Sequence, residues 1–95
     1  MNIDNKRREH PSVELDRILN EYLEPLYALN GRSYFQLDES RRDDLKSRRV
    51  AYNSSIVSEE IRILMGSMPQ GEIKEKLRDK MREIKNLLDK VPDFA

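Results

Sequence analysis

The stretch SVELDRILNEYLEPLYALN, residues 12–30, decides the fold class, because its apolar side chains recur at the spacing of an α-helix. Successive members of this series are four, three, four and three residues apart: Leu15, Leu19, Tyr22, Leu26 and Leu29. Such spacing places all of them on one face of a helix. Pro11 and Ser12 suit the first helical turn, and Gly31 suits a helix end. We therefore predict a helix over residues 12–30 that packs on another element.

The same spacing recurs near the end of the chain. The second series comprises Leu77, Met81, Ile84, Leu88 and Val91. The segment GSMPQG, residues 66–71, separates this series from the preceding residues, since glycine commonly ends a helix and proline opens the next segment. Pro92 cannot continue a helix, so the pattern stops there. The sequence thus predicts a helix over residues 70–91.

The segment between these two helices, residues 38–66, contains no decisive helix breaker. Its first residue is an aspartate, which suits an N-terminal cap. The polar run Asn53 to Ser55 is a weak point, because asparagine and serine side chains compete for backbone hydrogen bonds. We nevertheless expect one continuous helix. Leu45 is the only large apolar residue of residues 39–49, whereas residues 56–65 contain six, so we expect a largely exposed first half and a buried second half.

Together these patterns predict an all-α fold, a small bundle of three main helices over about residues 12–30, 38–66 and 70–91. Residues 11–95 form a single helical domain in this prediction, and residues 1–10 form a flexible polar arm. Each apolar series covers only about two heptads, which fits either a coiled coil or an ordinary bundle, and we favour the bundle. The predicted core comprises Leu19, Leu26, Ile61, Leu64, Leu77, Ile84 and Leu88.

The chain is short for a stable core. A domain of 95 residues buries only about two thirds of the surface that its unfolded chain exposes. Two apolar helix faces beside so thin a core favour self-association, in which a second copy covers apolar surface. We therefore expect a homo-oligomer.

Charge and composition limit the classes of partner. Lysine plus arginine and aspartate plus glutamate each total 18, so no net charge attracts nucleic acid or an anionic membrane. No stretch approaches the roughly 18 apolar residues of a membrane span, and the first residues lack the apolar segment of a secretory signal. The absence of cysteine suits a reducing compartment. We expect a cytoplasmic protein that does not bind membranes.

Residue types that usually carry catalysis are scarce. The one histidine, His10, lies in the predicted arm, where a fixed catalytic geometry is hard to maintain. Without cysteine, and with a single histidine, a metal site would need a carboxylate cluster, and no Glu-x-x-His pair occurs. The three glycines lie at predicted helix boundaries and form no phosphate-binding loop. We expect no enzymatic activity, no bound metal and no cofactor.

The most unusual local feature is the basic run RRDDLKSRR, residues 41–49. Two pairs of its arginines are seven residues apart, which predicts two parallel rows along a helix. One row is Arg41 with Arg48, the other is Arg42 with Arg49, and Lys46 lies between them along the chain. Such rows can bind phosphates or the carboxylates of a partner protein. The alternative is a solvated face with ordinary intrahelical ion pairs, and in both cases we expect mostly exposed arginines.

Three aromatic residues accompany these arginines: Tyr34, Phe35 and Tyr52. A ring beside an arginine can stack on a base while the guanidinium binds a phosphate, and tyrosine is also over-represented at protein-binding hot spots. The alternative is that the rings belong to the core, with tyrosine hydroxyls that reach water. We take these aromatics, together with the basic residues of the run, as candidate partner-binding residues.

The sequence thus favours a small, non-catalytic helical interaction module that forms a homo-oligomer. We expect it to regulate or bridge a partner protein. The alternative is a protein that binds nucleic acid or a nucleotide through the arginine-rich run, and the zero net charge counts against this alternative.

Overall fold

The structure, a computed structural model, describes residues 10–92, and all of the regular secondary structure in this range is helical. Within it the α-helices are α2 (Pro11–Leu26), α3 (Glu39–Tyr52), α4 (Ser55–Gly66) and α5 (Glu72–Leu88). Two short 3-10 helices, η1 (Tyr27–Leu29) and η2 (Tyr34–Gln36), lie between α2 and α3. The all-α prediction is therefore confirmed, whereas most of the predicted arm lies outside the described residues.

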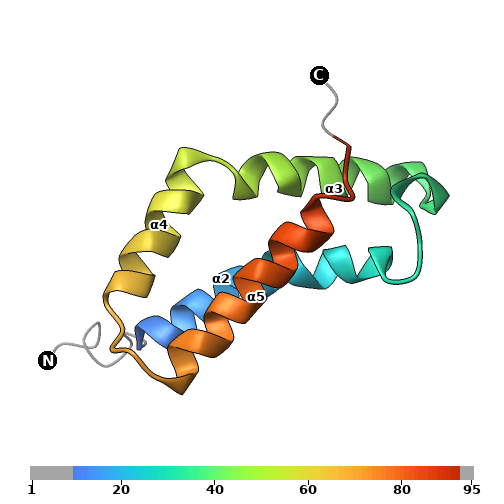
Figure 1. The fold of residues 1–95 in the computed structure, drawn as a ribbon. Coiled ribbons are helices and arrows are strands. Elements are labelled where there is room, and N and C mark those ends of the chain that lie inside the picture. Colours follow the sequence, from blue (N-terminus) through green and yellow to red (C-terminus); the bar gives the residue numbers. More distant parts are fainter. Residues whose placement is uncertain (1–9, 93–95) are drawn as a thin grey trace, which may run out of the picture.

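Helix α2 is the element on which the other helices pack. It contacts α3, α4 and α5, and its contact with α5 is the most extensive. Figure 1 shows α5 running across α2, while α3 and α4 meet at an angle. The side of α2 that holds the series found in the sequence is buried, namely Leu15, Ile18, Leu19, Leu23 and Leu26. The core therefore forms around α2, because this helix carries the broadest buried side.

A polar network fixes α5 against α2 at the edge of this core. The Lys80 ammonium donates to a carboxylate oxygen of Asp16 and, at 3.0 Å, to Oδ1 of Asn20. Asn20 Nδ2 in turn donates to the other Asp16 oxygen at 3.3 Å. All three side chains are partly buried, so the network adds little net stability. Its main effect is to favour one register of α5 against α2.

The predicted helix over residues 38–66 is two helices, so the prediction of three main helices is wrong. Helix α3 ends at Tyr52, where Asn53 N–H donates to the Arg49 carbonyl at 3.1 Å. The Ser54 hydroxyl then accepts a hydrogen bond from Val57 N–H at 3.2 Å, which caps α4. The polar run therefore breaks the helix, because Ser54 satisfies the first donors of a new helix instead of continuing the old one.

Helix α4 is also less buried than its sequence predicts. Of its six large apolar residues only Ile61 is buried, whereas Ile56 and Ile63 are 80% and 54% exposed. Val57, Leu64 and Met65 are partly buried against the core. Leu64 is thus the one member of the predicted core that is not fully buried, since α4 touches α2 and α3 along a single edge.

The outer two predicted helices are slightly shorter than expected. Helix α2 ends at Leu26, one residue after Pro25, and the chain continues as the 3-10 helix η1. Helix α5 ends at Leu88, yet Val91 beyond it is buried. The last residue of each apolar series therefore packs in the core from outside the α-helix.

Replacing Ile84 with Ala should lower the free energy of unfolding by about 2 to 5 kcal/mol, because the side chain is fully buried and its loss leaves a cavity. Val50→Ala is the matched control, since Val50 is exposed on α3 and should change that free energy by less than about 0.5 kcal/mol. Urea denaturation measures both. Equal effects of the two variants would show that this core assignment is wrong.

Candidate interaction surfaces

The two arginine rows flank the side of α3 that packs on the core. Leu45 is buried and Tyr52, seven residues further along, is partly buried, so both lie on the inner side of the helix. The arginine pairs lie along its two edges, Arg41 with Arg48 and Arg42 with Arg49. The outward side carries the exposed residues Glu39 and Asp43 instead. The outer side of this half of α3 is therefore acidic.

Arg48 bonds to a backbone group that α2 cannot satisfy by itself. Pro25 lacks the N–H that would otherwise donate to the carbonyl oxygen of Glu21, four residues earlier. The Arg48 Nη1 donates to this oxygen at 2.8 Å, and its Nε donates to Asp44 at 3.0 Å. Arg48 thus replaces the hydrogen-bond donor that the proline removes, and it joins α3 to α2.

Arg42 closes the connector between α2 and α3. Its Nη1 donates to the Leu37 carbonyl at 2.7 Å, just before α3 begins. The hydroxyl of the buried Tyr34 donates to the Arg42 carbonyl at 3.2 Å. The structure therefore brings together two of the candidate residues, Arg42 and Tyr34, but uses both to hold the start of α3.

The prediction that the arginines are mostly exposed holds only for Arg41, which forms an exposed ion pair with Asp38 at 3.7 Å. The other basic residues of the run are half-buried: Arg42, Lys46, Arg48 and Arg49. These side chains lie at the edges of the side of α3 that packs on the core. Their long aliphatic stems cover apolar surface there while their charged groups reach solvent, which explains their partial burial.

The candidate aromatics do not form one stacking surface with the arginines. The rings of Tyr34 and Phe35 meet edge to face at 5.3 Å between centroids, with Tyr34 buried and Phe35 exposed. Tyr52 lies elsewhere and packs edge to face on Tyr22 of α2 at 5.2 Å. Burial raises the pKa of the Tyr52 hydroxyl, and the nearby Tyr22 raises it further. Tyr34 and Tyr52 therefore act as structural contacts.

The sequence analysis missed an exposed row on α4, formed by Ile56, Glu60 and Ile63, which we call the α4 row. These residues are four and three apart, so they lie on one side of the helix. A helix that packs along one edge needs a narrow apolar stripe, and the apolar residues of α4 span a wider arc. The signal was present in the sequence as an excess of apolar residues, which we interpreted as burial.

A groove opens between α2 and α5 near their first turns. Val13 and Ile73 form its exposed apolar walls, and Lys76 lies on its rim. The remaining lining residues are Ser12, Asp16, Leu77 and Lys80. We call this feature the α2–α5 groove. The hydrogen bond of Lys80 to Asp16 joins its two walls.

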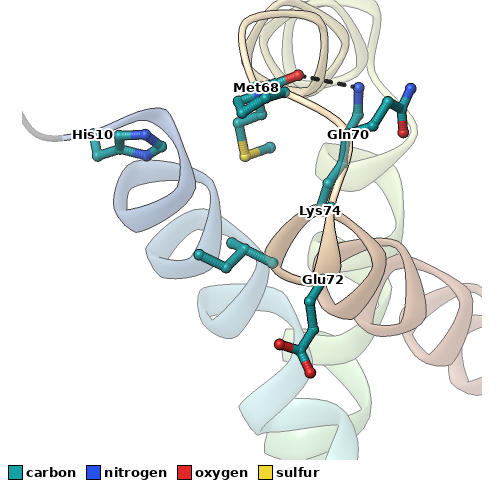
Figure 2. Close-up of a pocket in the computed structure, with 8 residues that line it drawn as sticks. His10, Met68, Gln70, Glu72 and Lys74 are labelled. Carbon is teal, nitrogen blue, oxygen red and sulfur yellow. Dashed lines mark hydrogen bonds between the residues drawn. The ribbon is translucent and has the colours of Figure 1, made fainter.

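A neighbouring pocket lies beside the turn before α5, and it is shown in Figure 2. Lys74 is 8% exposed, and its ammonium donates to the Met68 carbonyl at 3.3 Å. His10 lies on the other side of the pocket, and the Glu72 carboxylate points away from the ammonium (Figure 2). Lys74 therefore ties the turn to α5, and the pocket holds no convergent set of reactive groups.

His10 caps the first helix. Its Nδ1 accepts a hydrogen bond from Ser12 N–H at 3.1 Å and lies 2.7 Å from the Ser12 hydroxyl. A side-chain acceptor at this position satisfies one of the donors at a helix start. Among residues 10–92, no group of three or more histidine, aspartate or glutamate side chains has the arrangement to hold a metal ion. The histidine thus has a structural role.

Comparison with protein-family models, with curated proteins and with solved structures found no match to this chain. Within the described range, each helix is too short or too polar to cross a lipid bilayer.

Replacing Arg48 with Met should lower the free energy of unfolding by about 1 kcal/mol, because it leaves the Glu21 carbonyl without a protein donor. In a Pro25→Ala background the alanine N–H can donate to that carbonyl, so Arg48→Met should cost less there. Urea denaturation of the four proteins in this cycle measures the coupling. The bond to Asp44 is lost in both backgrounds and cancels. Equal costs in both would show that Arg48 does not replace the missing donor.

Replacing Tyr52 with Phe should reduce the loss of stability at alkaline pH. The raised pKa of Tyr52 means that folding disfavours ionisation of its hydroxyl. The neutral hydroxyl therefore makes its full contribution to the free energy of unfolding below the ordinary tyrosine pKa of about 10. That contribution is lost as the pH rises through the raised value. Phenylalanine keeps the ring contact and cannot ionise, so its melting temperature should fall less above about pH 10. Tyr27→Phe, at an exposed ring, should retain the parent's pH dependence.

Proposed function

We propose that this chain is a non-catalytic helical interaction module that self-associates, with the α4 row as a contact surface. Self-association presents several copies of the same exposed helices, which suits a regulatory or bridging role toward another protein. The observation that carries the proposal is the mismatch in α4 between its apolar content and its burial.

The mismatch is specific to the side of α4 that faces away from α2. Ile61, on the inner side, is buried, whereas Ile56 and Ile63 lie on the α4 row and keep more than half of their surface in water. Single exposed apolar residues are ordinary, but two on one helix side that residues 10–92 leave uncovered favour a protein contact.

The size of the effect indicates what kind of surface must cover the row. Burying a fully exposed isoleucine side chain stabilises a contact by about 1.5 to 3 kcal/mol. Ile56 and Ile63 are 80% and 54% exposed, so together they supply about 2 to 4 kcal/mol. A dissociation constant of about 1 μM needs about 8 kcal/mol net, after the entropic cost of association. The row therefore requires an apolar surface opposite it, which contributes its own burial.

Two further observations support a binding role without chemistry. The only histidine serves as a helix cap, and the buried Lys74 ammonium is bonded to a backbone carbonyl. The alternative, binding of nucleic acid or a nucleotide through the basic run of α3, has weaker support. Arg42 and Arg48 each donate to a backbone carbonyl, and the outward side of α3 is acidic. Phosphate binding there would break bonds that position the helix.

Replacing Ile56 and Ile63 together with Gln should abolish self-association at roughly 10 to 100 μM, because the α4 row then offers no apolar surface to bury. Light scattering and sedimentation equilibrium of the parent and the variant measure this. The melting temperature at the lowest usable concentration should remain close to that of the parent, since both side chains are exposed.

Val50→Gln is the control for this experiment. Val50 is 72% exposed but lies on α3, outside the row, so its replacement should leave the association unchanged. A parent that stays monomeric throughout the range, or a double variant that associates like the parent, would contradict the proposed function.

A further inference from the structure

The α4 row combines apolar and acidic groups in a fixed order. Glu60 stands between Ile56 and Ile63 and forms no hydrogen bond or ion pair with any residue of the range 10–92. The neighbouring Glu59 differs, because its carboxylate pairs with Arg62 on the same helix. Glu60 is therefore the carboxylate of this row that is available to a partner.

The α2–α5 groove has the opposite character. Val13 and Ile73 expose apolar surface along its walls, and Lys76 stands on its rim. Lys80 already pairs with Asp16, whereas Lys76 forms no ion pair or hydrogen bond within the part of the chain that the structure describes. The groove thus offers apolar surface together with one available ammonium group.

We propose that the α4 row of one copy of this chain docks into the α2–α5 groove of another copy. This inference rests on the proposed function and names the surface that receives the row. The two surfaces are complementary in charge, since Glu60 meets Lys76, and in polarity, since isoleucines meet the walls formed by Val13 and Ile73. The groove therefore provides the apolar surface that the row requires.

The spacing of these residues also fixes the direction of the docked helices. Glu60 precedes Ile63 by three residues on α4, and Ile73 precedes Lys76 by three residues on α5. Both separations correspond to about 4.5 Å along a helix. Ile63 can therefore face Ile73 while Glu60 faces Lys76 only when α4 and α5 run antiparallel. In this arrangement Ile56 lies over the aliphatic stem of Lys80.

A symmetric contact between identical surfaces fits the charges less well. Pairing the α4 row with itself around its centre would bring two Glu60 carboxylates together, and pairing the groove with itself would bring two Lys76 ammonium groups together. Like charges in a contact oppose association. Of these contacts, only that between row and groove combines opposite charges. Two copies can make it reciprocally, each placing its row in the groove of the other, or successive copies can make it head to tail.

The test uses charge reversal at the two proposed partners in the full chain. Glu60→Lys and Lys76→Glu should each raise the dissociation constant roughly tenfold, since each places like charges in contact. An equimolar mixture of the two single variants should associate like the parent, because the lysine introduced on α4 of one variant then meets the glutamate introduced on α5 of the other. The double variant E60K/K76E should also associate like the parent. Sedimentation velocity measures all four, and circular dichroism confirms that each is folded.

The mass of the parent at rising concentration distinguishes the two arrangements, because a reciprocal contact closes at the dimer and a head-to-tail contact leaves an unused surface at each end. A Glu60→Lys or Lys76→Glu variant that associates like the parent would overturn the docking proposal. If the Ile56 and Ile63 double variant still abolishes association in that case, the proposed function stands and only the receiving surface is wrong. If that variant also associates normally, both proposals fail.

Discussion

The packing of α3 on α2 includes one carbonyl group that its own helix cannot satisfy. Pro25 leaves the Glu21 oxygen without its usual donor, and the guanidinium of Arg48 bonds to it from α3. This contact, the buried Leu45 and the ring contact of Tyr52 with Tyr22 together hold α3 on α2. Leu45 faces the core, the arginine rows form the edges of the packing side, and Glu39 and Asp43 face outward. A basic sequence thus gives a helix whose outer side is acidic.

Burial is greatest in the central pair α2 and α5 and much lower in α3 and α4. Helices α2 and α5 each bury several leucine or isoleucine side chains against one another, whereas α3 and α4 each bury one. Helix α4 has the apolar content of a core helix in a peripheral position. Its available surface is therefore a product of the small size of the chain, which places too few elements around α2 to cover every apolar side.

Features that follow from the apolar spacing within one helix could be predicted from the sequence. Features that depend on contacts between residues far apart in the chain could not. The apolar series correctly identified α2, α5 and nearly all of the core, because helical spacing is a local property. The break before Ser54 depends on a single capping bond, which competes closely with helix continuation. The role of Arg48 depends on Pro25, which lies on another helix, so no pattern within residues 41–49 could reveal it. The prediction of mostly exposed arginines therefore fails for Arg42, Arg48 and Arg49, which are half-buried, and the apolar excess of α4 does not translate into burial.

The cap at Ser54 makes α4 a unit with its own beginning, joined to α3 by a short turn and held to α2 mainly through Ile61. Regions with few buried contacts open locally at a lower free energy than the whole domain unfolds. Helix α4 can therefore open and close while α2 and α5 remain paired. A protein that covers α4 binds only its closed form, so occupancy of this surface slows the exchange of the α4 amide hydrogens with solvent and orders the helix that it recognises.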